Sequence, residues 1–174
     1  MNLSNASRPI GAALLALAML ASMPASADDV TAGDLTIAHP HSRPNLPNRP
    51  SAAYMKISNA GTEDDRLIAA RSESFGIIEL HTVEHQDGVM KMMPVEAIGV
   101  PAGGEAVLEP GGFHMMMFDA IRRFKIGDSF DAVLTFEKAG DVTVTFGVEK
   151  IKHGSKKMNH DGNGSGHSGH GSDG

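Results

Sequence analysis

The chain has 174 residues, with 21 acidic and 15 basic side chains, a formal net charge of −6 and no cysteine. An acidic balance without a basic block argues against nucleic acid and anionic lipid as partners. The lack of cysteine excludes disulfide bonds and thiolate chemistry, so any site for a soft metal must be built from methionine and histidine.

Residues 1–27 predict a secretory signal peptide. Arg8 supplies a weak positive region, residues 10–20 form a short apolar run, and the small residues 25–27 suit cleavage after Ala27. The apolar run is too short for a permanent membrane span, although an uncleaved N-terminal anchor is the alternative. We therefore expect a protein of the bacterial periplasm that is not inserted in the membrane after cleavage.

Residues 28–152 predict a single all-β domain. Short apolar runs alternate with turn residues, most clearly at residues 131–137 and 141–148, where every second side chain is apolar. This pattern is typical of an antiparallel β-sandwich or barrel. The proline-rich stretch 39–50 predicts a surface loop, with His39 and His41 as loop residues or, alternatively, a weak divalent-metal site.

Residues 153–174 have a different character. These 22 residues contain seven glycines, four serines and four histidines without an apolar period. Such a segment cannot bury enough surface to offset its ordering entropy, so we predict a flexible tail.

The stretch "GGFHMMMFDA" (residues 111–120) is the most unusual in the chain. A β-strand here places His114 and Met116 on one face and Met115 and Met117 on the other. Residues two apart in a strand are separated by about 7 Å, so His114 and Met116 can reach one metal ion. Met115 and Met117 are then predicted to lie in the core or to support the site. The alternative for His114 and Met116 is an ordinary strand with a core-filling methionine.

Further candidate ligands lie upstream. They are His81 and, on one face of residues 89–95, Met90 and Met92, with Met93 on the opposite face. Residue pattern alone does not choose between Met90 and Met92. Thioether sulfur is soft and neutral and favours Cu(I), whereas a blue-copper electron carrier needs a cysteine thiolate, which this chain lacks.

The spacing His81–x10–Met92–x21–His114–x–Met116 resembles the motif of the periplasmic PCuAC (DUF461-like) copper chaperones. The surrounding segments "AAYMKISNAG", "GVMKMMPV" and "LEPGGFHMMMF" are similar to that family as well. The resemblance implies a cupredoxin-like β-sandwich that holds Cu(I) through two histidines and two methionines. It also implies delivery of copper toward the CuA centre of cytochrome c oxidase, together with a Sco-like protein. Family members often carry a tail that binds Cu(II), and the corresponding candidates are His153, Met158, His160, His167 and His170.

These observations favour a non-enzymatic copper metallochaperone. The alternative is a periplasmic copper-buffering or resistance protein without a dedicated recipient, because the same ligands serve both roles. For the tail, the alternative is a solubilising linker whose histidines are incidental.

Overall fold

The computed structural model describes residues 28–46, 49–86 and 89–150. The predicted signal peptide and the predicted tail lie outside these residues. All regular elements in the described part are strands: β1 (Val30–Ala32), β2 (Leu35–Ser42), β3 (Ser51–Asn59), β4 (Asp65–Arg71), β5 (Phe75–Gln86), β6 (Val89–Pro94), β7 (Ile98–Val100), β8 (Glu105–Leu108), β9 (His114–Ala120), β10 (Ser129–Phe136) and β11 (Gly140–Val148). No helix among the described residues is long and apolar enough to cross a membrane.

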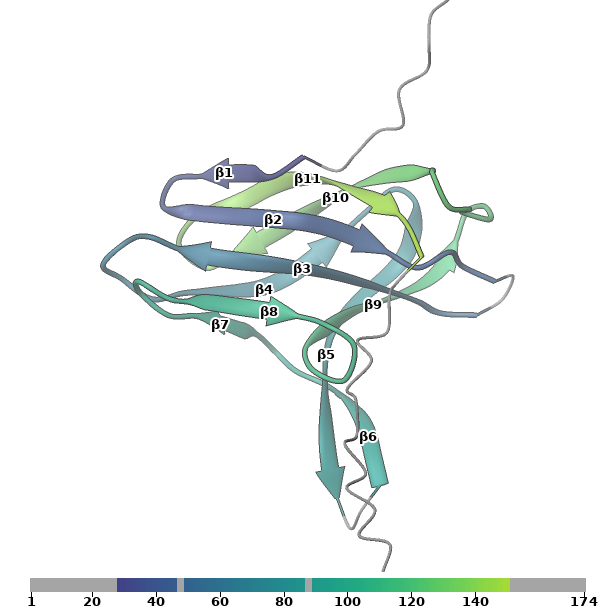
Figure 1. The fold of residues 1–174 in the computed structure, drawn as a ribbon, viewed down its shortest axis with the longest axis horizontal. Helices are drawn as coiled ribbons and strands as arrows, with labels where there is room; N and C mark the ends of the chain where they lie inside the picture. Colours follow the sequence, from purple (N-terminus) through teal and green to yellow (C-terminus); the bar gives the residue numbers. More distant parts are fainter. Residues whose placement is uncertain (1–27, 47–48, 87–88, 151–174) are drawn as a thin grey trace, which may run out of the picture.

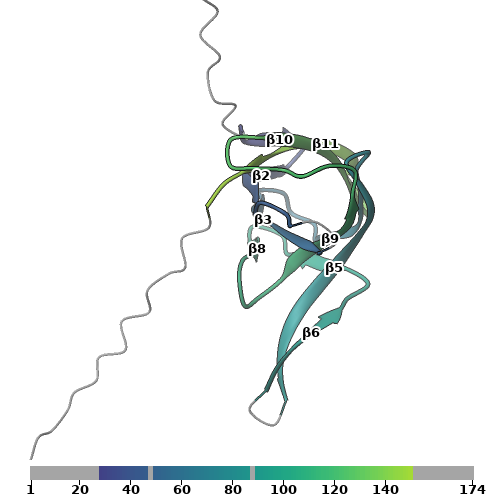
Figure 2. The same cartoon turned by 90° about the vertical axis from the view of Figure 1, so that its right-hand side faces the viewer.

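The strands form one continuous hydrogen-bonded path that curls around a core (Figures 1 and 2). Its order is β6-β5-β9-β3-β2-β11-β10-β4-β7, with β1 paired to β2 and β8 paired to β3. The pairing of β11 with β2 is parallel, and the other pairings of this path are antiparallel. The predicted all-β, predominantly antiparallel fold is confirmed.

The core is built by alternating side chains, as the sequence pattern predicts. In β11, Val144 and Phe146 are fully buried while the threonines between the apolar positions face solvent. Phe146 pairs with Phe130 of β10, and their rings stack with centroids 5.5 Å apart. Burying side chains of this size contributes about 1.5–3 kcal/mol each, so the β10–β11 hairpin is a major contributor to the hydrophobic core.

The β5–β6 hairpin extends beyond the body of the domain as an arm (Figure 1). Strand β5 pairs with β9 from Phe75 to His81 and with β6 from His81 to Gln86. His81 therefore marks the position at which β5 leaves the body and enters the arm. All six residues of β6 are exposed, so the arm is held mainly by backbone pairing to β5.

Asp65, at the start of β4, holds the β10–β11 turn in place. Its buried carboxylate accepts backbone N–H bonds from Arg66 (2.7 Å), Lys138 (2.9 Å) and Ala139 (3.0 Å). Burial raises the pKa of Asp65, but these N–H groups and the Lys138 charge lower it by more, so the pKa lies below its ordinary value of 3.8.

We predict that Asp65→Asn lowers the free energy of unfolding by about 2 kcal/mol at neutral pH, because the charged acceptor of three N–H bonds is lost. Because the folded-state pKa is depressed, the wild-type contribution is complete above pH 3.8 and is lost as the pH falls through the folded-state pKa. Urea unfolding at neutral and acid pH tests this. The two proteins should converge in acid, and the exposed-site control Glu73→Gln should follow the wild type. The prediction would be contradicted if the free energies of unfolding of the wild type and Asp65→Asn differed by the same amount in acid as at neutral pH.

Candidate metal centre

Two buried histidines face each other across the β5–β9 pair. The antiparallel register sets His81 directly opposite His114, and their ring centroids are 5.7 Å apart. Their exposed fractions are 9% and 4%, although both lie at the point where the arm leaves the body. Cross-strand partners share a face of the sheet, so both imidazoles project to the same side.

The hydrogen bonds of these histidines identify which ring nitrogen carries a lone pair. His114 Nδ1 lies 3.0 Å from the carbonyl oxygen of Gly112, and His81 Nε2 lies 2.8 Å from Glu79 Oε2. A carbonyl and a carboxylate only accept, so each of these nitrogens is the N–H donor. The second nitrogens, His114 Nε2 and His81 Nδ1, are left with free lone pairs.

These two nitrogens are buried and have no hydrogen-bond partner among the residues that the structure describes. A buried polar atom without a partner costs about 1–3 kcal/mol, and native structures contain few of them. Two such atoms on neighbouring rings therefore indicate a binding site, because both nitrogens can donate their lone pairs to one metal ion. The hydrogen bonds from the opposite nitrogens are the arrangement that orients histidine ligands in metal sites.

Met116 lies on the same face as His114, two residues further along β9. It is opposite Glu79 of β5 on one side and opposite Ala52 of β3 on the other. Met115 and Met117 point the other way and are 0% and 1% exposed within the core. The prediction that the three adjacent methionines have different surroundings is confirmed.

Met92 lies on the arm, opposite Val83. Val83 follows His81 by two residues in β5, so Met92 projects to the same face as the two histidines. Met92 is 63% exposed. Met90 has the same exposure and faces the same way, but it pairs one step further out along the arm, opposite His85.

A cavity of about 300 Å³ brings Met92, His114 and Met116 together, with Tyr54 and Arg43 among its other lining residues. His81 is not part of this lining, but its ring lies against that of His114. The structure thus places three of the four predicted ligands around one cavity and the fourth beside it. The tail candidates His153, Met158, His160, His167 and His170 lie outside the described residues.

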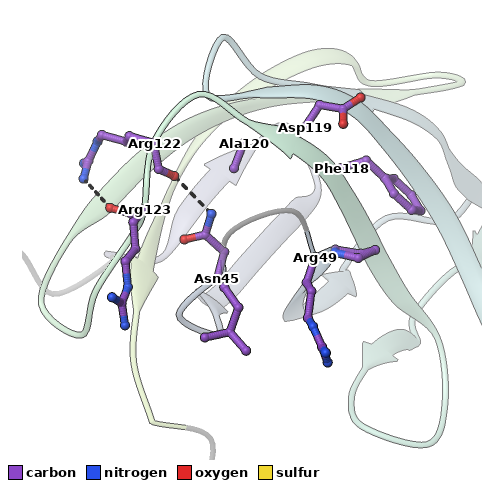
Figure 3. A pocket seen from close by; sticks show the side chains of 9 residues that line it. Asn45, Arg49, Phe118, Asp119, Ala120, Arg122 and Arg123 are labelled. Carbon is purple, nitrogen blue, oxygen red and sulfur yellow. Dashed lines mark hydrogen bonds between the residues drawn. The ribbon is translucent and has the colours of Figure 1, made fainter.

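The loop between β2 and β3 forms one wall of this cavity. Its buried Asn45 donates to the carbonyl oxygen of Arg122 (3.0 Å) and accepts from the backbone N–H of Phe124 (2.6 Å). Figure 3 shows Asn45 in the neighbouring pocket of about 430 Å³, which is lined by Arg49, Arg122 and Arg123 and contains no methionine or histidine. Asn45 therefore anchors the loop whose residues Leu46, Arg49 and Pro50 line both the cavity and this pocket.

Sequence reasoning missed Glu79, the acceptor that orients His81. The available signal was the segment "ELH", because residues two apart on a strand share a face and their side chains can meet. The two imidazoles and two thioethers carry no formal charge when the imidazoles are neutral. This set suits a soft monovalent cation better than a hard divalent one.

Residues 35–148 match the family model described as "Putative lipoprotein LpqE-like". An uncharacterized protein of Rickettsia prowazekii is 30% identical over 88 residues, which is 50% of this chain and 49% of that protein. The chain spans between 49% and 60% of the length of the curated relatives that it matches.

Two solved structures with bound copper are similar to the described fold. The copper-bound PCuAC domain from PmoF2 is 28% identical with a TM-score of 0.60, over 71% of this chain and 98% of that domain. The Cu(I) form of DR1885 from Deinococcus radiodurans is 26% identical with a TM-score of 0.50, over 66% of this chain and 78% of that protein. The fold is therefore that of PCuAC domains, and the predicted cupredoxin-like architecture is confirmed.

Proposed function

The chain belongs to the LpqE-like family, and on this basis we propose that it is a copper chaperone that carries Cu(I) through His81, Met92, His114 and Met116. The resemblance of the sequence to the PCuAC copper chaperones is confirmed by the similar solved structures. The observation that carries the proposed ligand set is the pair of buried, unpartnered nitrogens, His81 Nδ1 and His114 Nε2, beside a methionine-lined cavity.

Copper is the cargo that this set of donors fits. Thioether sulfur is soft and polarisable and favours Cu(I), and imidazole binds copper in either oxidation state. Two neutral nitrogens and two neutral sulfurs add no charge, so the ion and its four ligands together carry the single positive charge of Cu(I). Burial of that one charge costs less than burial of a divalent ion would.

The placement of Met92 supports a carrier rather than a permanent metal site. The histidines and Met116 belong to the body of the domain, whereas Met92 lies on the exposed arm. A donor that is open to solvent can be exchanged for a donor of an acceptor protein while the body still holds the ion. We propose that copper enters and leaves along this side of the cavity.

The proposed recipient is the CuA centre of cytochrome c oxidase, reached directly or through a Sco-like protein. This requires export through the predicted signal peptide (residues 1–27) to the periplasm. The proposal includes no catalysed reaction, and residues 153–174 are proposed as an additional Cu(II)-binding segment.

Copper transfer tests the proposal. The Cu(I)-loaded protein is mixed anaerobically with an apo CuA domain, and copper arrival is followed by the absorption of the assembled CuA centre after controlled oxidation. We expect faster transfer than from a small-molecule Cu(I) chelate that sets the same free Cu(I) concentration, because a docked complex exchanges ligands directly. Transfer no faster than from the chelate would contradict delivery to CuA.

Deletion of the gene separates a carrier from a buffer. Loss of a carrier lowers oxidase activity when copper is scarce. Loss of a buffer instead raises sensitivity when copper is abundant, with oxidase activity unchanged, and that pattern would assign the chain to copper buffering.

A further inference from the structure

A second cluster of metal-ligating side chains lies where β2 and β11 end side by side (Figure 1). It consists of His39, His41 and Glu149, and its ligand atoms all lie within 4.8 Å of one another. The Nε2 atom of His39 is 3.0 Å from Glu149 Oε1, and that of His41 is 4.0 Å from the same oxygen. Donors bound about 2.0–2.1 Å from one metal ion stand about 3–4 Å apart. Small side-chain movements, with loss of the proton that His39 Nε2 holds beside the carboxylate, would therefore bring these three donors to one ion.

A β-bulge brings the two histidines together. The register of β2 with β3 shifts between Ala38 and His41, and His39 has a positive φ of 48°. The backbone N–H of His39 is bonded to Asp29 Oδ1 at 3.0 Å, which satisfies a donor that faces away from the strand ladder. A bulge changes the direction of side chains, and here the two imidazole rings stack with centroids 4.3 Å apart.

The tautomer of His41 is set in the same way as in the first site. Its Nδ1 lies 2.8 Å from the carbonyl oxygen of His39, which only accepts, so Nδ1 is the N–H donor and the Nε2 lone pair faces Glu149. A backbone carbonyl in this position orients many histidine ligands. The backbone N–H of Glu149 is bonded to the carbonyl oxygen of Ser42, which keeps Glu149 beside the end of β2.

We propose that His39, His41 and Glu149 form a second metal site, selective for a divalent transition-metal ion and foremost for Cu(II). Imidazole is a donor of intermediate hardness, and a carboxylate is a hard donor. Among divalent first-row ions, Cu(II) has the highest affinity for sites of this kind. The set contains no sulfur, so the methionine-lined cavity is the preferred site for Cu(I). The inference does not depend on the proposed chaperone function.

The two sites are close but separate. Tyr54 is next to both: its ring centroid is 5.5 Å from that of His41, and Tyr54 also lines the cavity with His114 and Met116. One protein can therefore hold copper in each oxidation state at neighbouring positions.

The test is a Cu(II) titration of the purified full chain, produced without a polyhistidine tag. The background carries four substitutions that remove the tail imidazoles: His153→Ser, His160→Ser, His167→Ser and His170→Ser. We expect one tight equivalent whose electron paramagnetic resonance spectrum shows coupling to two imidazole nitrogens. His39→Asn, His41→Ala and Glu149→Gln should each lower the affinity about tenfold or more.

The choice of variants keeps the result interpretable. Asparagine tolerates the positive φ at residue 39, and Glu149 is half-exposed, so neither change threatens the fold. The control Glu105→Gln, at an exposed carboxylate on β8, should leave Cu(II) binding unchanged. Absence of a tight equivalent, or binding that is insensitive to all three cluster variants, would overturn the proposal.

Discussion

His114→Ala is expected to lower the Cu(I) affinity of this protein more than about 100-fold, because even the partners of metal ligands contribute about 10- to 100-fold. His114 is 4% exposed, and its unpartnered Nε2 and the cavity that it lines make it the best-anchored of the proposed ligands. Met116→Leu removes only the sulfur and keeps the side-chain volume, so its loss of affinity reports coordination rather than packing.

Anaerobic competition against a chromophoric Cu(I) chelator measures these affinities, and the arm offers a matched control. Met90 and Met92 are both 63% exposed and point to the same side, but only Met92 is opposite Val83, next to the histidines. Met92→Leu should therefore weaken Cu(I) binding, and Met90→Leu should leave it unchanged. Equal effects of these two substitutions, or wild-type affinity in His114→Ala, would refute the proposed ligand set.

The β-domain was predictable because the apolar period of two dominates its longest strands. In β11 the buried and exposed residues alternate from Asp141 to Phe146, as the pattern of valine and threonine predicts. The same reasoning correctly separated Met115 and Met117, which are buried, from Met116. Local alternation is a strong signal in strands such as β10 and β11, which have one face on the core.

The proline-rich stretch 39–50 shows where this reasoning fails. It was predicted to be a surface loop, but His39 to Ser42 belong to β2, and His41 and Ser42 pair with β3 beyond a bulge. Pro40 and the positive φ of His39 interrupt the period of two, so the strand is hidden from pattern analysis. The prediction was wrong for these four residues because a bulge shifts the register by one position.

The candidate site could be predicted only in part from the amino-acid sequence. Strand spacing places His114 and Met116 on one face, but it cannot reveal that β5 lies beside β9 or that His81 is opposite His114. That pairing joins segments far apart in sequence and was not predicted; the resemblance to the PCuAC motif implied only that His81 and His114 belong to one set of ligands. The orienting contact of Glu79 depends on side-chain geometry, which a motif that contains only the ligands does not describe.

Glu79 provides the second test, because we expect Glu79→Ala to lower Cu(I) affinity by about 10- to 100-fold without removing a ligand. Its carboxylate accepts from His81 Nε2 at 2.8 Å and so keeps the Nδ1 lone pair directed toward the site. Without this acceptor, His81 can adopt the other tautomer, in which Nδ1 carries the proton and cannot bind a metal ion.

Nitrogen-15 NMR of the histidine rings distinguishes this positioning role from a general loss of structure. The wild type should show His81 protonated at Nε2, and Glu79→Ala should show a mixture of tautomers. In Glu79→Gln the amide oxygen still accepts a hydrogen bond, so this variant should recover most of the affinity and the wild-type tautomer. Glu84→Ala, on the opposite face of β5, is the matched control and should change neither quantity. If Glu79→Ala kept both the wild-type tautomer and the wild-type affinity, Glu79 would not be the residue that orients His81. The orientation of the His81 ring would then depend on the strand register of β5 and β9 alone.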